Sequence, residues 1–186
     1  MKKMLLALCA AITASVAQAS PARLNDAQAY SLCKADKTSY IAIVWPIAQG
    51  KDESIEKLFR KYGSLKYKKI VYFKPDQSAM LLHDAHPHIT NIKEHVTMYF
   101  PSSHIYKQPA RIYLVTFKDL DTAVACKLAI RRLFNLGYSS IHITDYHYEA
   151  IKLAEFFYAS NHHRSIVATI SFIEFLERFG DCLKNQ

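Results

Sequence analysis

Two histidines, a threonine, an aspartate and a glutamate, all able to take part in hydrogen bonding or proton transfer, lie within the stretch Tyr138–Ala150, which reads Y-S-S-I-H-I-T-D-Y-H-Y-E-A. They are His142, Thr144, Asp145, His147 and Glu149. Ile141 and Ile143 alternate with polar residues, which predicts a short buried strand that runs directly into a helix. Open α/β sheets place ligands at such junctions, beyond the carboxyl ends of their strands.

Two interpretations of this junction stand side by side. In the functional one, His142, Asp145 and Glu149 are candidate catalytic residues, because a histidine beside an acid can shuttle protons and the free N–H groups of a helix start bind anions. In the structural one, Thr144 or Asp145 caps the following helix, and Glu149 complements its positive end.

Basic residues elsewhere suggest an anionic ligand. Lys127 and Arg131 lie one turn apart on a helix predicted over Asp121–Leu136, and Lys68 lies on a predicted strand, Leu65–Phe73. Lysine and arginine on one face suit phosphate, although most such runs are solvated helix faces. The predicted ligand-binding set is Lys68, Lys127, Arg131, His142 and Asp145. The chain has only four glycines, which excludes a P-loop and a dinucleotide-binding fingerprint.

Histidines offer an alternative chemistry. His83, His86 and His88 follow one another closely, and His147 lies in the junction with Asp145, so these side chains together could hold zinc. H-E-x-x-H is absent and the spacing by itself is weak, so our primary prediction contains no metal site, and the cofactor stays open.

The start of the chain predicts export. Lys2 and Lys3 precede a short apolar run, and Ala17-Gln18-Ala19 matches a signal-peptidase site, so residues 1–19 read as a bacterial signal peptide and residues 20–186 as the mature protein. The apolar run is too short for a membrane anchor. We therefore expect a periplasmic or secreted protein with no transmembrane anchor after cleavage.

Charge and cysteines limit the partners and the redox chemistry. The formal charge is +8, which favours anionic small molecules, but no block of basic residues is interleaved with aromatics, so nucleic acid is not favoured. The mature part has three cysteines, and an oxidising compartment allows one disulfide, which we assign to Cys33 and Cys182 because Cys126 falls on a buried helix face. Three free thiols are the alternative.

Periodicity predicts one α/β domain with a sheet of about four strands packed against helices. The strands are predicted at 40–47, 65–73, 111–117 and 139–144. The helices are predicted at 24–34, 52–62, 121–136, 146–158 and 166–183, with two less certain ones at 77–83 and 90–99. For the 121–136 helix we expect Asp121 as the N-cap, Gly137 as the C-terminal stop and an apolar face of Val124, Leu128, Leu133 and Leu136.

Three segments resemble a largely uncharacterised bacterial family. They are K-Y-G-S-L-K-Y-K-K (Lys61–Lys69), A-I-R-R-L-F-N-L-G (Ala129–Gly137) and S-I-H-I-T-D-x-x-x-E-A (Ser140–Ala150). In that family such an α/β region precedes a nucleotidyltransferase-like region, which we expect to be absent here because the chain ends at Gln186. The resemblance implies an α/β fold and a phosphorylated ligand, and it highlights Lys68, Lys127, Arg131, His142, Asp145 and Glu149.

Three functions follow as hypotheses. The leading one is a module that binds an anionic phosphorylated ligand, such as a nucleotide or a sugar phosphate. The second is a metal-dependent hydrolase that uses the His/Asp cluster. The third is a secreted protein-interaction module, for which the tyrosine-rich surface would contact a protein partner. The sequence does not decide whether the protein is an enzyme.

Overall fold

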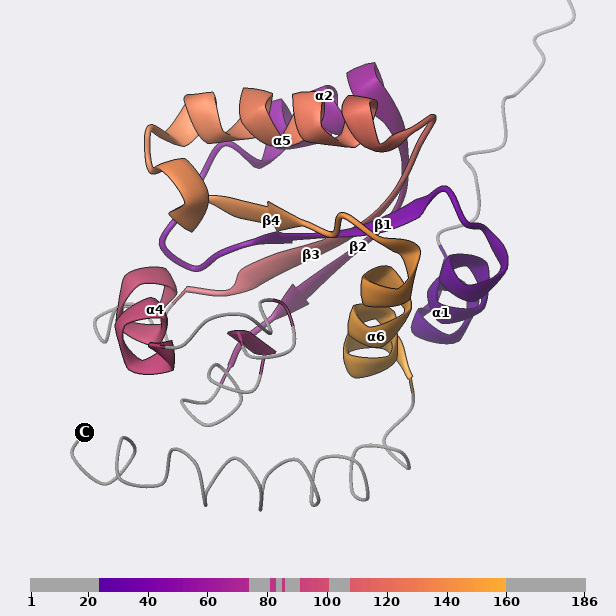
Figure 1. Cartoon of the computed structure of the whole chain (residues 1–186), viewed down its shortest axis with the longest axis horizontal. Helices are drawn as coiled ribbons and strands as arrows, with labels where there is room; N and C mark the ends of the chain where they lie inside the picture. Colours follow the sequence, from indigo (N-terminus) through magenta and orange to yellow (C-terminus); the bar gives the residue numbers. More distant parts are fainter. Residues whose placement is uncertain (1–23, 74–80, 83–84, 86–90, 101–107, 160–186) are drawn as a thin grey trace, which may run out of the picture.

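The computed structural model describes residues 24–73, 81–82, 85, 91–100 and 108–159 (Figure 1). The strands are β1 (Ser39–Val44), β2 (Gly63–Val71), β3 (Ala110–Phe117) and β4 (Ile141–Ile143). The helices are α1 (Asp26–Ala35), α2 (Asp52–Tyr62), α4 (Ile92–Tyr99), α5 (Leu120–Phe134), the 3-10 turn η1 (Gly137–Ser139) and α6 (His147–Tyr158). The predicted α/β class with a four-stranded sheet is confirmed. The predicted helix 166–183 lies outside the described residues.

The four strands form one sheet in the order β2-β3-β1-β4, and every neighbouring pair is antiparallel. In the centre, Ile43 of β1 lies opposite Ile112 of β3 and His142 of β4. The chain runs β1-α2-β2 and then β3-α5-β4. The two strands of each β-α-β unit are parallel to each other, and one strand of the other unit lies between them. This is the split β-α-β arrangement of ferredoxin-like folds.

The antiparallel pairing changes the setting of the predicted junction. In an open parallel sheet the carboxyl ends of neighbouring strands meet at one edge. Here the end of β4 lies beside the beginning of β1, because Ala42 pairs with Ile143. The junction is therefore surrounded by the start of β1 and by helices. The carboxyl ends of neighbouring strands in this sheet do not meet there.

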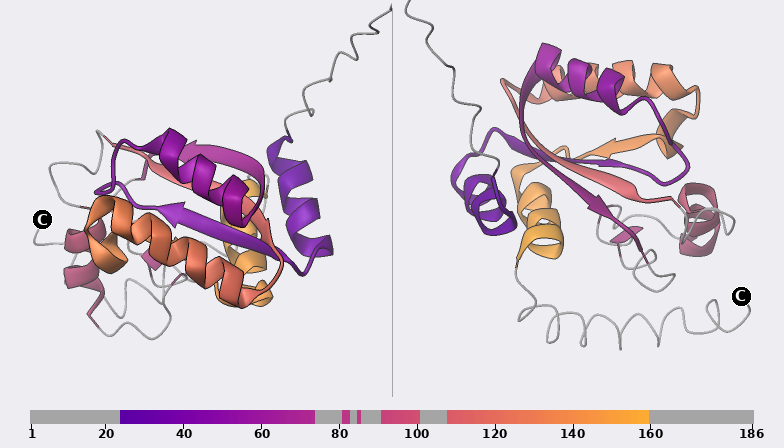
Figure 2. Two further views of the ribbon diagram at one scale, coloured as in Figure 1. Left: turned by 90° about the horizontal axis from the view of Figure 1, so that it is seen from above. Right: turned by 180° about the vertical axis from the view of Figure 1, so that it is seen from behind.

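Helices cover both faces of the sheet. Helices α2 and α5 lie side by side on one face, and α1, α6 and α4 lie on the other (Figures 1 and 2). The first layer buries Ala42, Val44, Ile55, Phe59, Val115, Ile130, Ile141 and Ile143, among others. The second buries Ile41, Ile43, Trp45, Ile112, Leu114, Leu153, Ala154 and Phe157, among others. Strands β1 and β3 are apolar on both faces because each is central and covered twice.

Helix α2 confirms its predicted bounds, 52–62, and buries Ile55 and Phe59 against the sheet. Gly63 follows the helix directly with an extended φ of −161° and begins β2. A glycine is required there because the neighbouring strand lies very close. A Cβ at Gly63 would lie 2.3 Å from the carbonyl oxygen of Thr116 on β3, so only a residue without a side chain fits against that strand.

Helix α5 begins and faces the sheet differently from the prediction. Its N-cap is Asp119, whose Oδ1 accepts a hydrogen bond from the Thr122 N–H at 2.9 Å, and it ends at Asn135 in the left-handed conformation. The buried residues are Ala123, Cys126, Lys127 and Ile130. Val124, Leu128 and Leu136 of the predicted apolar face are each more than one third exposed. The face buried against the sheet therefore combines the small Ala123 and Cys126 with Ile130 and Lys127, and it is not the face that the large apolar residues predicted.

Helix α1 forms where it was predicted, because Asn25 and Gln28 cap it reciprocally. Helix α4 falls within the predicted range 90–99, whereas most of the predicted helix 77–83 lies outside the described residues. Within the described ranges, no helix combines the length and apolar composition that a membrane span needs.

Candidate anion site at the β4 edge

Strand β4 positions the predicted junction at one edge of the sheet. Ile141 and Ile143 point toward α5 in the core, and His142 points to the opposite face, where it is 8% exposed. Thr144 follows, and its hydroxyl oxygen accepts a hydrogen bond from the Ile41 N–H at 3.2 Å. The predicted alternation is confirmed, and Thr144 fixes β4 against β1 instead of capping α6.

The Glu149 side chain binds backbone N–H groups at the start of α6. Its Oε2 accepts hydrogen bonds from the backbone N–H groups of Asp145, at 3.0 Å, and Tyr146, at 3.4 Å. A carboxylate near a helix start also complements the positive end of the helix dipole. Some of the backbone N–H groups that we expected to bind an anion therefore already donate to Glu149, and the Glu149 carboxylate places a negative charge at this position.

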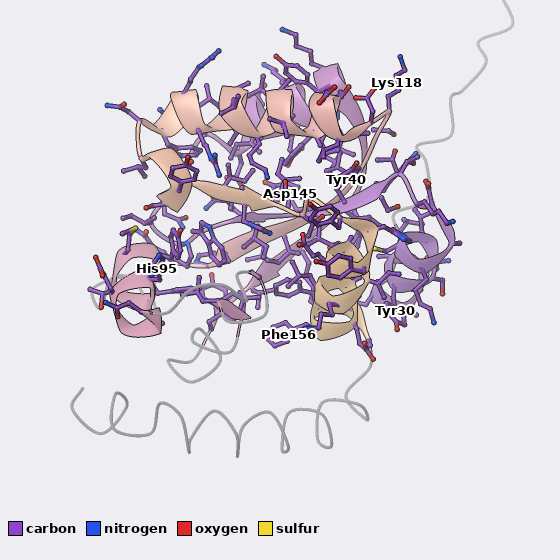
Figure 3. The ribbon with its side chains drawn as sticks, viewed as in Figure 1. Tyr30, Tyr40, His95, Lys118, Asp145 and Phe156 are labelled. Atoms are coloured by element: carbon purple, nitrogen blue, oxygen red, sulfur yellow. The ribbon has the colours of Figure 1, made fainter. Side chains whose placement is uncertain are left out.

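Asp145 holds Lys127. The Lys127 ammonium donates to Asp145 Oδ1 at 2.6 Å, with the lysine side chain 10% exposed and the carboxylate 47% exposed. Figure 3 shows Asp145 beside Tyr40, at the point where β4 ends and β1 begins, and this carboxylate also contributes to the raised pKa of Tyr40, whose main cause is burial. The Lys127 side chain is thus buried along the sheet, and its ammonium group reaches the edge of the sheet, where Asp145 neutralises its charge.

Arg131, one turn after Lys127, is in a different state. It is half-buried, and its guanidinium carbon lies 4.3 Å from the centre of the Tyr138 ring on η1. Burial lowers the pKa of Arg131, while Tyr138, Tyr99 and Asp145 act in the opposite direction. Its Nε is buried and has no hydrogen-bond partner among the described residues. We call Lys127, Arg131, Tyr138 and Asp145 the β4-edge site.

The other buried or half-buried cations in the described part of the chain all have a carboxylate at 3.1 Å or less. These pairs are Lys68 with Asp52 and Glu56, Lys69 with Asp26, Arg111 with Asp52, and Lys127 with Asp145. Arg131 has no such partner within 4.0 Å in the described ranges. Since a buried charge is costly unless it is paired, Arg131 is the exception that requires an explanation.

Lys68 does not join this site. It lies on β2, the strand at the opposite edge of the sheet, and its ammonium contacts Asp52 at 2.8 Å and Glu56 at 3.1 Å. Burial by itself lowers the pKa of Lys68, but the hydrogen bonds to Asp52 and Glu56 outweigh it, so the pKa is raised. The predicted ligand set is therefore divided between two edges, and Lys68 belongs to a separate ion-pair cluster.

The residues of the metal alternative are not brought together in the described ranges. His83, His86 and His88 lie outside them, and His147 Nε2 is hydrogen-bonded to the Cys33 carbonyl oxygen at 2.8 Å. No three potential metal ligands gather in the part of the chain that the structure describes.

The cysteine pairing stays a prediction. Cys33 is a free, buried thiol whose pKa is raised to about 12 by burial and by the nearby Asp36. Cys182 lies outside the described residues. Cys126 is also free and buried, as its place on the inner face of α5 predicted.

Two aromatic neighbours of Arg131 had no place in the predicted site. Tyr138 opens the stretch singled out above, but nothing in the sequence ties it to Arg131. Tyr99, on α4, is far from Arg131 in the sequence and interacts with it electrostatically. Only the tertiary structure brings α4 to this end of the sheet.

Comparisons with known proteins add partial likenesses of fold. No protein-family profile and no curated protein matches the chain. Among solved structures, it is similar to nucleoside diphosphate kinase from Aquifex aeolicus, with 19% identity and a TM-score of 0.45 over 66% of this chain and 95% of that one. It is also similar to nucleoside diphosphate kinase from Encephalitozoon cuniculi, with 16% identity and a TM-score of 0.47 over 66% and 90% of the two chains. A likeness of this degree does not bear on what this chain binds or catalyses.

Proposed function

We propose that this protein is a binding module for an anionic, phosphorylated small molecule, and that Arg131 is the group that binds the anion. The observation that carries the proposal is the state of this one cation. Arg131 is half-buried without a carboxylate in the described ranges, whereas its four counterparts there are paired within the protein.

Guanidinium chemistry suits this role. Arginine is charged at any physiological pH and presents parallel N–H donors that match two oxygens of a phosphate. The Tyr138 ring, 4.3 Å away, holds the plane of the guanidinium and so reduces the freedom that the side chain would lose on binding. Partial burial strengthens the attraction, because fewer water molecules screen it.

The remaining predicted residues take secondary roles in the proposal. Lys127 adds positive potential near Arg131, but its charge is largely balanced by Asp145 at 2.6 Å. The start of α6 is no longer assigned as a donor, because the Glu149 carboxylate lies there and accepts hydrogen bonds from Asp145 and Tyr146, the two residues just before the helix. His142 remains a candidate for orienting the ligand from the other face of β4. Nucleotides and sugar phosphates both fit this chemistry.

Isothermal calorimetry with inorganic phosphate, a sugar phosphate and a nucleoside monophosphate tests the proposal. Arg131→Gln should weaken binding at least tenfold, since a charge-assisted hydrogen bond contributes about 1.5–3 kcal/mol. Arg132→Gln is the matched control, because Arg132 is the next residue on α5 and is exposed; its affinity should equal that of the wild type. Equal weakening by both variants would indicate only a general charge effect, and the proposal would then be wrong.

We also propose that the protein is exported to the periplasm or beyond, on the basis of the signal-peptide pattern in residues 1–19. N-terminal sequencing of the protein recovered from a periplasmic fraction should begin at Ser20. Recovery from the cytoplasm with Met1 intact would contradict this.

A further inference from the structure

The outward face of α5 differs from that of its neighbour α2. The two helices lie side by side on one face of the sheet, and each also presents a side to solvent (Figure 2). On α2 most of the exposed residues are charged, and ion pairs form within the helix: Lys57 with Glu53 at 2.9 Å, and Arg60 with Glu56 at 3.0 Å. Such a surface is typical of a solvated helix face. It requires no further partner.

The outward face of α5 is apolar in the middle and charged at its two ends. Val124 is 36% exposed, Leu128 is 43% exposed, and Ala125 between them is exposed as well. Asp121 lies at one end of this stretch and Arg132 at the other, and both are exposed. The five residues follow one another at intervals of three or four, so they form one line along the helix. We call this line the α5 seam. Figures 1 and 2 show α5 at the outer surface of its layer, with no other described element over it.

The two charges of the α5 seam are not neutralised along the helix. The seam residues one turn away from Asp121 and Arg132 are Val124, Ala125 and Leu128, and none of them carries a charge. Asp121 and Arg132 are 11 residues apart, which is about 16 Å along the axis and too far for an ion pair. Within the described ranges, no ion pair of 4.0 Å or less includes either residue. The seam thus combines exposed apolar side chains with an opposite charge at each end.

A second copy of the same helix complements every part of the seam. When two copies of α5 lie antiparallel, with a two-fold axis through the middle of the seam, Asp121 of each copy faces Arg132 of the other. The same axis places Leu128 of each copy opposite Ala125 of the other, so a large side chain meets a small one. Each contact occurs twice, which is the property of a self-complementary two-fold interface.

We infer that the protein forms a homodimer in which the α5 seams of two copies pack antiparallel. The charge pattern favours a second copy over an unrelated partner, because the acidic end and the basic end of one seam each find their opposite in another seam. A single pair of helices lies at the small end of specific interfaces, so we expect a reversible dimer that forms at micromolar concentrations. The inference does not depend on the proposed function, which assigns anion binding to Arg131 within one protomer.

Sedimentation velocity of the full mature protein over a series of concentrations tests the dimer. Asp121→Arg and Arg132→Asp should each weaken self-association roughly tenfold or more, because two attractive pairs become repulsive. An equimolar mixture of these two variants should form the dimer again, since the altered charge of each then faces an opposite charge on the other. Arg60→Asp on α2 is the matched control: it makes the same change of charge on the neighbouring helix, and its self-association should equal that of the wild type.

Leu128→Asn tests the apolar part of the seam. Because Leu128 is 43% exposed, the change should leave the fold intact and weaken the dimer, since the contact of Leu128 with Ala125 of the second copy is lost. Circular dichroism of this variant and of the two charge variants should match that of the wild type.

The mixture separates the loss of an interface from the loss of the fold, because two misfolded variants would not restore each other. A wild type that stays monomeric throughout the micromolar range overturns the inference and leaves the seam to a different partner. A dimer that both charge variants retain uses another surface, and the inference is then wrong as well. A mixture that stays monomeric when each variant is folded also overturns it.

Discussion

On the β2 side of the sheet, two buried or half-buried cations share two carboxylates, whereas at the β4 edge one carboxylate serves one of two cations. The β2-side cluster consists of Lys68, Arg111, Asp52 and Glu56. At the β4-edge site Asp145 pairs with Lys127, and Arg131 rests on the ring of Tyr138. The helices α2 and α5 that carry part of each group lie side by side on the same face (Figure 2).

The two groups differ in whether their cations hold parts of the fold together. In the β2-side cluster Arg111 is 3% exposed and also donates to the Gln49 side chain and the Ala48 carbonyl oxygen. Each of its bonds ties a loop or a helix to the sheet. Arg131 has equal charge but holds no other element by an ion pair in the described ranges. A cation of the first kind stabilises the fold, and one of the second kind is the kind that we propose binds the ligand.

The largest expected effect is in the β2-side cluster. Asp52→Asn should lower the free energy of unfolding by about 3 kcal/mol, because buried Arg111 keeps its charge and loses its carboxylate. Breaking a buried ion pair usually costs about 3–5 kcal/mol. We expect the lower value here because Asp52 is itself 38% exposed. Urea denaturation measures it. Glu53→Gln is the control: Glu53 is exposed and, in the described part of the chain, pairs with Lys57 alone, so the stability of this variant should not change. A loss equal to that of the control would refute the structural role.

The second prediction concerns Asp145, whose replacement should change both the stability of the protein and its affinity for phosphate. Asp145→Asn should cost about 1–2 kcal/mol, because Lys127 loses its partner at a half-exposed carboxylate. It should also raise the affinity for inorganic phosphate about fivefold, since a nearby negative charge in water-like surroundings contributes about 1 kcal/mol. Glu155→Gln, an exposed change further along α6, should do neither. Unchanged phosphate affinity in Asp145→Asn would show that Asp145 does not oppose the anion.

The third prediction concerns pH on the β2 side. Burial and the hydrogen bond to Asp26 raise the pKa of Tyr67 to about 12, from a usual value of 10.0. A raised pKa means that the folded state holds the proton longer, so this stabilisation is complete below pH 10.0 and is lost as the pH rises toward about 12. Tyr67→Phe should therefore be less stable than the wild type at pH 9, roughly one unit below the titration, and the gap should close through that window. A gap that stays constant with pH would contradict the assignment.

The smallest expected effect concerns Tyr138 in the β4-edge site. Tyr138→Leu removes the ring under Arg131, and a cation–π contact at an exposed position is worth about 0.5–1 kcal/mol. We expect a two- to fivefold loss of phosphate affinity by that measure, with little change in stability because Tyr138 is 74% exposed. Tyr138→Phe should retain the wild-type affinity. Calorimetry on the two variants decides whether the ring, rather than the hydroxyl, orients the guanidinium.

Local signals predicted much of this fold. The bounds of α2 follow from Ile55 and Phe59 at helical spacing, and the start of α1 follows from the Asn25 cap. The two faces of β4 follow from the alternation of Ile141 and Ile143. In each case the information lies within a few residues, where propensity and periodicity act.

The buried face of α5 could not be predicted in this way. Periodicity favoured the large apolar residues, yet Leu128 stays 43% exposed while Ala123 and Lys127 are buried. Which side of a helix approaches a sheet depends on how closely the two backbones can pack, and small residues allow the closest approach. Lys127 fits on this side because its aliphatic stem is apolar and its charge reaches Asp145.

The strands, most of the helices, the α/β class and the residue types that can bind an anion could all be predicted from the sequence. Which of these charges are already paired within the protein became clear from the folded arrangement of the chain. Lys127 and Asp145 are 18 residues apart, and Lys68 and Asp52 are 16 apart, so both pairings depend on the strand order β2-β3-β1-β4. That order is set by packing of the whole chain and not by local propensity, and it separates Lys68 from Arg131 by the width of the sheet.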